Sequence, residues 1–383
     1  MSGSADKDLE NSLEALPPAI RSLLEEHGFS PKWLLEQARL SRVGTRSNVV
    51  SGEITPLDPE DLAGIPEPGT KRHKELSERG TDALRSGECA LSVLAGGMAT
   101  RMGGVIKALV PAAYDRTFLE LRLGEQEYLE QTYGKKPPLW LMTSHATHQG
   151  IEKALTGRLT DHSLALFRQG LSVRLTETGE IFRTADGAPS LHAPGHGDFV
   201  DSLKRSRLLH QFLDAGGKYL LVTNLDNLGG GLDPVLIGLH LESECAVTCE
   251  VVEKNEGDRG GIPARLDGRP VVLEEFRLPE DFDPRSVSVF SVNNFAFDAE
   301  RLLDLEVNWT YFEVTKTVEG KTAIQYERLI NEITFHLPTN YVRVPRTGTS
   351  TRFLPVKDHD DLIRQHEDLH ALAKARGMTT SPK

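Results

Sequence analysis

Cysteine is scarce in this chain, which has three among its 383 residues: Cys89, Cys245 and Cys249. Three cysteines are too few for a disulfide framework, and no Cys-x-x-Cys pair suggests a zinc site. A free cysteine behaves as a small apolar residue, so all three are expected to be buried in strands. The scarcity excludes a small fold that depends on disulfides.

Long apolar runs and an excess of positive charge are also missing. No apolar stretch reaches the roughly 18 residues of a membrane helix, and the acidic N-terminus lacks the basic flank and apolar run of a signal peptide. The net charge is −12, whereas proteins that grip nucleic acid carry a positive excess. We therefore expect a cytoplasmic protein that binds neither membranes nor nucleic acid. Small anions would be held by local cations and backbone N–H groups.

The composition, with 38% hydrophobic and 26% charged residues, is typical of a soluble globular protein. Residues 1–87 are expected to form a helical segment, interrupted by prolines, that wraps the core. In residues 88–338 strands alternate with helices, which predicts an α/β domain with a mostly parallel sheet covered on both faces. Residues 339–383 are expected to form a short C-terminal extension. Ligands bind such sheets outside the carboxyl ends of the strands.

Hydrophobic periodicity places the individual elements. Helices are expected at residues 13–16, 20–27, 32–40, 73–84, 118–133, 199–213 and 360–376. Strands are expected at residues 90–94, 139–143, 164–167, 218–226, 246–252, 271–273, 287–297 and 341–344. The sequence shows no internal repeat and no low-complexity tract.

A glycine-rich turn follows the first of these strands and reads LAGGMATRMGG from residue 94, with Lys107 just beyond it. Glycines such as Gly96 and Gly97 let backbone N–H groups approach an oxyanion closely. Arg101 and Lys107 add cationic donors. The turn is neither a Walker A loop nor a dinucleotide fingerprint, since G-K-[ST] and G-x-G-x-x-G are absent. The alternative is a glycine turn without a ligand.

Two further loops carry candidate residues. His196 lies between two glycines in the run HAPGHGD at residues 192–198, where it has little to pack against and is expected to contact a ligand. Asp198 is placed to cap the helix that follows. Asp226 lies at the polar end of a strand, a usual position for a carboxylate that holds Mg²⁺ together with waters and substrate phosphates. The alternatives are a turn or capping histidine and an Asx-turn.

The amides Asn293 and Asn294 stand within an otherwise apolar strand. Buried amides need hydrogen-bond partners, and sugar hydroxyls are natural ones. Because neighbouring strand residues face opposite ways, at most one of the two can point into a given pocket.

Taken together, the chain resembles the eukaryotic-type UDP-glucose pyrophosphorylases (UTP–glucose-1-phosphate uridylyltransferases), which are similar to the UDP-N-acetylhexosamine pyrophosphorylases. The resemblance covers residues 91–362. It rests on LAGGMATRMG, RTFLEL, PGHGDFVDSL, YLLVTNLDNLG, RGG, FSVNNFAF, VTKTVEG and TRFLPVKDHDDL, in that order. It implies a Rossmann-like nucleotidyltransferase (GT-A-like) fold with a mixed, mostly parallel sheet, and a catalytic domain over residues 88–338. The short C-terminal extension is expected to lack the family's β-helix tail.

The resemblance also implies roles for individual residues. The nucleotide is assigned to the backbone of Gly96 and Gly97, with Gln169 as the residue that reads uracil, Gly195 beside the base, and His196 near the phosphates and sugar. Metal contact is assigned to Asp226, with Asn224 as its neighbour on the sugar side. The hexose hydroxyls are assigned to Gly261, Glu274 and Asn293 or Asn294. The reacting phosphates are assigned to Lys107 and Lys316.

These residue types suit an in-line attack of a sugar 1-phosphate on the α-phosphorus of UTP, with pyrophosphate leaving. Two unit charges about 4 Å apart interact by roughly 1 kcal/mol in water, but by roughly 4 kcal/mol at an effective dielectric of 20. Cations must therefore offset the repulsion between the two anionic substrates. A sufficient set is Mg²⁺, Lys107, Arg101 and Lys316. No general base is needed, because the attacking phosphate is already ionised. Catalysis would consist of positioning and charge stabilisation.

The glycine loop departs from the family pattern. Met98-Ala99-Thr100 lacks the usual middle glycine, and Ile106 rather than proline precedes Lys107. Arg101 is more typical of the N-acetylhexosamine branch. The alternatives are therefore the same reaction on N-acetylglucosamine, glucosamine or galactose 1-phosphate, or a nucleotide-sugar-binding module without turnover.

Overall fold

The computed structural model describes residues 2–44, 47–160 and 162–381. Within these residues the core is an eight-stranded sheet with the strand order β2-β19-β13-β16-β12-β3-β8-β9. The long strand β16 (Val289–Asp298) runs antiparallel to its neighbours β12 and β13, and the other neighbouring strands are parallel. The predicted α/β fold with a mixed, mostly parallel sheet is confirmed.

The remaining strands of this sheet are β2 (Leu62–Gly64), β3 (Cys89–Leu94), β8 (Leu139–Thr143), β9 (Leu164–Arg168), β12 (Tyr219–Asn224), β13 (Val247–Glu253) and β19 (Thr339–Arg343). All except β2 lie close to predicted positions, whereas β2 lies in the segment expected to be helical. Parallel strands covered on both faces read as continuous apolar runs, which is why their positions are legible in the sequence.

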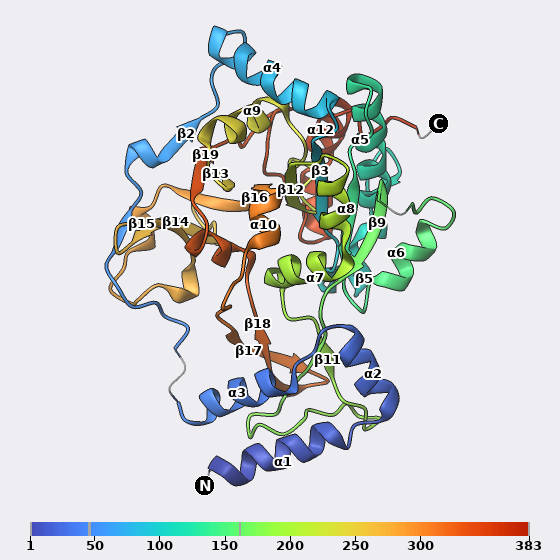
Figure 1. Ribbon diagram of the computed structural model, residues 1–383, viewed down its shortest axis with the longest axis vertical. Helices are drawn as coiled ribbons and strands as arrows, with labels where there is room; N and C mark the ends of the chain where they lie inside the picture. Colours follow the sequence, from blue (N-terminus) through green and yellow to red (C-terminus); the bar gives the residue numbers. More distant parts are fainter. Residues whose placement is uncertain (1, 45–46, 161, 382–383) are drawn as a thin grey trace.

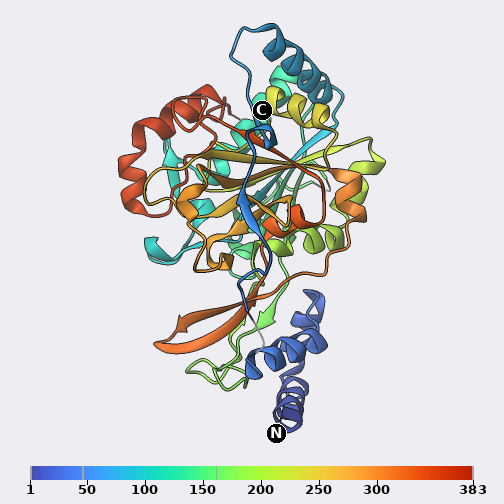
Figure 2. The same cartoon turned by 90° about the vertical axis from the view of Figure 1, so that its left-hand side faces the viewer.

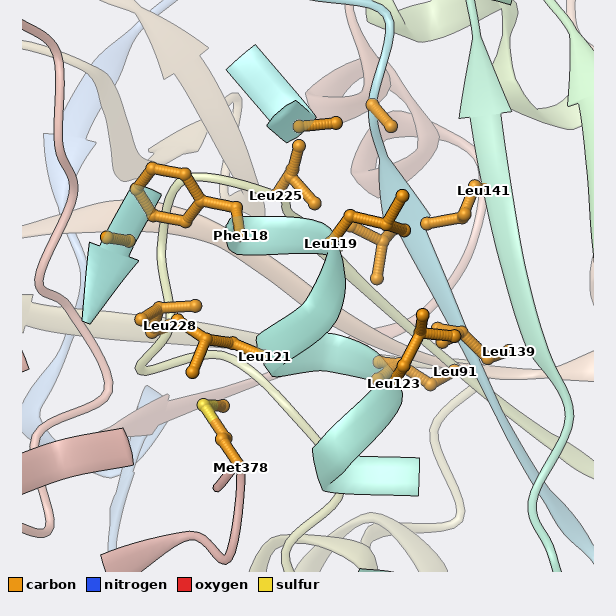
Figure 3. Close-up of a cluster of buried hydrophobic side chains, with 14 of the residues drawn as sticks. Leu91, Phe118, Leu119, Leu121, Leu123, Leu139, Leu141, Leu225, Leu228 and Met378 are labelled. Atoms are coloured by element: carbon orange, nitrogen blue, oxygen red, sulfur yellow. The ribbon is translucent and has the colours of Figure 1, made fainter. Parts of the chain in front are cut away.

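Helices cover both faces of the sheet (Figure 1). One face packs against α5 (Phe118–Tyr133) and α12 (His366–Ala375), and Figure 3 shows the α5 leucines meeting Leu91 and Leu141 of the strands. The other face packs against α7 (Phe199–Ser206), α8 (Leu208–Asp214) and α10 (Ala299–Asp304). The sequence marks the start of α5, because Thr117 and Glu120 form a capping box there.

Two predicted helices are each divided in two. The helix expected at residues 199–213 breaks at Arg207, whose positive φ of 64° ends α7 and starts α8. The helix expected at residues 360–376 becomes α11 (His359–Arg364) and α12, separated at Gln365. Periodicity detects the apolar face of such a segment but not a single residue that leaves helical geometry.

A pair of helices packs on β13, β16 and β19 of the central sheet. The helix α4 (Lys71–Arg85) packs against α9 (Pro234–Ser243) at two glycines. A Cβ at Gly80 would lie 1.9 Å from the carbonyl oxygen of Pro234, and a Cβ at Gly238 would lie 2.1 Å from that of Leu76. These glycines permit a backbone approach that no other residue would allow.

The N-terminal helices belong to a second body, called here the lower lobe. It contains α1 (Ser2–Glu14), α2 (Pro18–Glu26), α3 (Pro31–Arg42), β10 (Ser172–Val173), β11 (Leu191–His192), β17 (Phe312–Val318) and β18 (Lys321–Glu327). Figures 1 and 2 show it below the sheet, with segments far apart in sequence side by side.

The three segments expected from sequence do not correspond to separate bodies in the structure. Within residues 1–87, helices α1–α3 pack in the lower lobe, whereas α4 packs on the central domain. Residues 339–383 contribute β19 to the central sheet, where it pairs with β13 and β2. A smaller sheet of β1 (Ile54–Pro56), β14 (Gly261–Leu266) and β15 (Arg269–Glu274) flanks the central one. No helix among the described residues is long and apolar enough to cross a membrane.

Candidate active site

A cavity of about 350 Å³ opens at the carboxyl ends of β3, β8, β9 and β12. This edge is the usual ligand position in open α/β sheets. Its walls are Leu94, Ala95, Gly96, Gly97, Met98, Lys107, Met142, Gln169, His196, Asn224, Leu225 and Asp226. Seven residues singled out from sequence, distant along the chain, are thus brought together. A larger groove of about 690 Å³ between the lower-lobe helices contains none of them.

The glycine loop and Gln169 meet at one end of the cavity. A Cβ at Gly96 would lie 2.8 Å from Oε1 of Gln169, so any other residue at this position would displace the Gln169 amide. The Gln169 amide nitrogen donates to the carbonyl oxygen of Gly195 at 3.3 Å. A Cβ at Gly97 would meet open space, so this part of the backbone is free to face a ligand.

The loop that contains His196 begins at Gly195, whose φ of 84° favours glycine. The backbone N–H of Ile330 donates to Nδ1 of His196 at 3.1 Å, so this nitrogen is unprotonated and Nε2 carries the proton. Burial lowers the pKa of His196 to about 4. The side chain is therefore a neutral hydrogen-bond donor on the cavity wall.

The prediction that Asp198 caps the following helix is wrong. Its carboxylate accepts no hydrogen bond from the helix N-terminus. Instead it accepts from the backbone N–H of Gly170 and from the Ser202 hydroxyl, and it pairs with Arg328. Asp198 is 1% exposed. A short acidic side chain before a helix favours a cap, but here a buried arginine from a distant segment competes for it.

Asp226 and Lys107 form an ion pair on the opposite wall. Asp226 follows the end of β12, and Lys107 begins a short 3₁₀ turn. The Asp226 side chain is 20% exposed and the Lys107 side chain is 14% exposed, so both remain within reach of a ligand. Among the described residues, no group of three His, Cys, Asp or Glu side chains could hold a metal ion. A divalent cation here would rest on Asp226 and on the phosphates of a ligand.

The strand amides point apart at an irregularity of β16, where Asn293 has a left-handed φ of 59° and the register with β13 shifts. Asn294 is buried away from the cavity, where its Nδ2 donates to Glu250 at 3.0 Å and its Oδ1 accepts from Thr223 at 2.7 Å. Asn293 donates to Oδ1 of Asn224 at 2.9 Å, and its own Oδ1 is buried without a hydrogen-bond partner. Asn293 is therefore the amide that faces the site.

Gly261 and Glu274 lie outside the cavity but beside it. They pair across β14 and β15, and Glu274 accepts from Nδ2 of Asn331 at 2.5 Å. Burial raises the pKa of Glu274, and the Asn331 hydrogen bond opposes this shift. Asn331 directly follows Ile330, whose backbone N–H donates to His196. This cluster is therefore connected to the cavity through His196.

Two predicted cations do not line the cavity. Arg101 is exposed on the turn that follows the glycine loop. Lys316 lies on β17 of the lower lobe, with a side chain that is 47% exposed and 3.6 Å from Oε1 of Glu327. Their assigned roles stay predictions.

One segment that was given no role from the sequence forms hydrogen bonds with Asp226 and Asn227. We call residues 351–357 the strap. The backbone N–H of Val356 donates to the Asp226 carbonyl oxygen at 3.1 Å, and Asn227 exchanges hydrogen bonds with the strap at Leu354 and Arg352. Lys357 comes next and is exposed. The signal was present in the motif TRFLPVKDHDDL, but only the tertiary structure shows that this segment pairs with the backbone of residues 226 and 227.

Residues 37–383 match the protein family described as UTP–glucose-1-phosphate uridylyltransferase. The chain belongs to this family. A relative named UTP–glucose-1-phosphate uridylyltransferase 2, from Dictyostelium discoideum, is 28% identical over 338 residues, which cover 80% of this chain and 65% of the relative. One from Hordeum vulgare is 30% identical over 298 residues, covering 73% and 62%. The chain thus spans less than two thirds of these two relatives.

Solved structures share the uridylyltransferase fold. UDP-glucose phosphorylase from Trypanosoma brucei has a TM-score of 0.74 at 24% identity, covering 94% of this chain and 78% of that one. A UDP-glucose pyrophosphorylase mutant from Leishmania major in complex with UDP-glucose has a TM-score of 0.74 at 21% identity, with the same coverage. The family resemblance inferred from sequence is confirmed.

Three histidines make the stability of this uridylyltransferase-family chain depend on pH. Burial lowers the pKa of His192 to about 3 and the pKa values of His196 and His240 to about 4. Below pH 6.5 the unfolded chain takes up protons that the folded chain does not bind, so stability is lost as the pH falls. At about 1.4 kcal/mol per pKa unit, the three together should lower the free energy of unfolding by about 6 kcal/mol between pH 7 and pH 5.

Denaturant titrations at the two pH values would measure this loss. His192→Gln should remove about a third of it, and the exposed His359→Gln should leave it unchanged. An equal loss in His192→Gln and the native chain would show that the acid sensitivity comes from other groups.

Proposed function

We propose that this chain transfers uridylate from UTP to glucose 1-phosphate, forming UDP-glucose and pyrophosphate. The observation that carries the proposal is the cavity at the strand ends, where the glycine loop, Gln169, His196 and the Lys107–Asp226 pair converge. Family membership supports the same activity. Its ligands would be small molecules, and we propose a cytoplasmic location.

The reaction needs the two anionic substrates to be held in line. An oxygen of the sugar phosphate forms a bond to the α-phosphorus while the bond to pyrophosphate breaks on the opposite side. Gly96 and Gly97 present backbone to the nucleotide, Gln169 faces its base, and the neutral His196 donates a hydrogen bond. Lys107 offsets charge that builds up on the phosphates. No side chain has to remove a proton, because the attacking phosphate is already ionised.

The residues present fit Mg²⁺ bound largely by substrate. Asp226 is the acidic side chain on the cavity wall, and Mg²⁺ commonly binds one or two carboxylates together with substrate phosphates. When bound there, the ion would neutralise phosphate charge. Lys107, the ion-pair partner of Asp226, would add its own positive charge beside the same phosphates.

A second sugar 1-phosphate is a candidate for the preferred substrate. Asn293 presents an unpartnered buried Oδ1, and Glu274 and Asn331 lie beyond His196, so acceptors for sugar hydroxyls are available. Galactose 1-phosphate differs from glucose 1-phosphate in the orientation of one hydroxyl, and glucosamine and N-acetylglucosamine 1-phosphate differ by one amino or acetamido group. The exposed Arg101 on the loop that resembles the N-acetylhexosamine branch favours the last of these as the alternative.

Pyrophosphate release tests the proposal directly. The chain would be incubated with Mg²⁺, UTP and each of the four sugar 1-phosphates, and initial rates would be compared. The fastest release is expected with glucose 1-phosphate. Faster release with another sugar would transfer the assignment to that sugar. Absence of release with any sugar and any nucleoside triphosphate would leave a nucleotide-sugar-binding module without turnover.

A further inference from the structure

Four of the chain segments that connect the lower lobe with the central domain meet at one buried ion pair, Asp198 with Arg328. The two side chains are 1% and 7% exposed. The segments are residues 169–172, 192–198, 305–312 and 327–330. Figures 1 and 2 show the narrow junction between the two bodies in which they lie.

The Asp198 carboxylate holds the first segment. It accepts a hydrogen bond from the backbone N–H of Gly170, and a Cβ at Gly170 would lie 3.2 Å from both carboxylate oxygens. Gly170 directly follows Gln169, the side chain that faces the glycine loop. Ser202 and Arg205 also donate to this carboxylate, so its orientation is fixed from its own helix.

The Arg328 backbone brackets the loop that contains His196. Its N–H donates to the Pro194 carbonyl oxygen at 2.8 Å, and its carbonyl oxygen accepts from the N–H of Gly197 at 2.9 Å. A Cβ at Gly197 would lie 2.6 Å from the carbonyl carbon of Arg328. His196 is therefore carried on a loop that is clamped at both sides.

The Arg328 guanidinium extends the connection into the lower lobe. It lies over the rings of Trp309 and Tyr311, 5.3 and 5.6 Å from their centroids, on the segment that enters the lobe. Tyr311 in turn contacts Trp33 of α3, with centroids 4.2 Å apart. A cation held between aromatic faces and a carboxylate has little freedom to move.

We propose that the Asp198–Arg328 pair is a positioning pair that fixes Gln169 and His196 relative to Lys107 and Asp226. It therefore sets how strictly the site discriminates between nucleotide bases. The inference rests on the proposed function, because only that function gives Gln169 a base to read. The pair itself touches no substrate. It acts through the backbone of Gly170 and through the loop of residues 194–198.

The Asp198→Asn variant tests the proposal, because it keeps the size and an acceptor oxygen but removes the charge. The kcat/KM ratio for UTP over CTP is expected to fall at least about tenfold, since a base-reading group displaced by a fraction of an ångström discriminates poorly. KM for UTP should rise, and kcat at saturating UTP should fall less than about threefold.

The matched control is Asp61→Asn, which breaks another carboxylate–guanidinium pair. Asp61 binds Arg265 with contacts of 2.9 and 2.7 Å on the flanking sheet, away from the cavity. Its UTP-to-CTP ratio should equal that of the native chain. An unchanged ratio in a folded Asp198→Asn variant would overturn the positioning role, whereas a native chain without turnover would overturn the proposed function instead.

Ser202→Ala decides the question if Asp198→Asn does not fold. It removes one hydrogen bond to the Asp198 carboxylate and leaves the ion pair with Arg328 in place. The ratio should fall about twofold to threefold, in the same direction as for Asp198→Asn. A ratio equal to that of the native chain in Ser202→Ala would count against the proposal.

Discussion

Replacing Asp226 by alanine is expected to slow pyrophosphate release at least about 100-fold, by analogy with the loss of one group that stabilises charge in a transition state. Asp226 is the acidic side chain among the residues that line the described cavity. Its loss would remove the carboxylate proposed to hold Mg²⁺ and would leave Lys107 without its partner. Initial rates at saturating UTP and sugar 1-phosphate measure the effect.

A matched control and a metal titration make this result specific. Asp304→Ala removes an exposed carboxylate at the end of α10 and should leave the rate unchanged. In Asp226→Ala the Mg²⁺ concentration needed for half-maximal rate should rise as well. A rate within about threefold of the native chain would refute the role assigned to Asp226.

The second large effect is expected for Lys357→Ala, which should also slow pyrophosphate release by about 100-fold. We propose that Lys357 supplies a phosphate-facing charge. The adjacent Val356 donates a backbone hydrogen bond to the Asp226 carbonyl oxygen, so the two segments lie side by side. Lys316, the second lysine chosen from sequence, lies instead on the lower-lobe hairpin beside Glu327. For Lys316→Ala we therefore expect a loss of less than about tenfold.

Parallel rate measurements on the two lysine variants would distinguish them. Lys374→Ala, on the C-terminal helix α12, serves as a control for loss of a positive charge. If Lys316→Ala were the more damaging variant, the lower lobe would have to move toward the cavity during the reaction, and the sequence-based assignment would hold.

Much of the fold was predictable because its signals are local. The strand at residues 90–94 is a run of buried apolar residues followed by glycines, and β3 occupies residues Cys89–Leu94. The helix at residues 118–133 has a capping box at its start and a glycine at its end, and its predicted limits match. The strands β17 and β18 were not foreseen, because polar stretches such as Thr315–Thr317 leave them without an apolar run or a regular alternation.

The features of the candidate site were also predictable where their signals are local. The glycine loop, His196 between two glycines, and a carboxylate after an apolar strand are recognisable because each depends on residues adjacent in sequence. Their meeting in one cavity follows from parallel strands that end at the same edge of a sheet. For these features, sequence pattern and tertiary structure agree.

The sequence by itself determined the α/β class, the family and the loops that line the cavity. Only the tertiary structure decided that Asp198 pairs with Arg328 rather than capping a helix, that Asn293 rather than Asn294 faces the site, and that the strap meets the backbone of Asp226 at Val356. The physical reason is that a polar side chain takes the partner that folding brings to it. Arg328 lies 130 residues from Asp198, and its distance in sequence gives no sign of that contact.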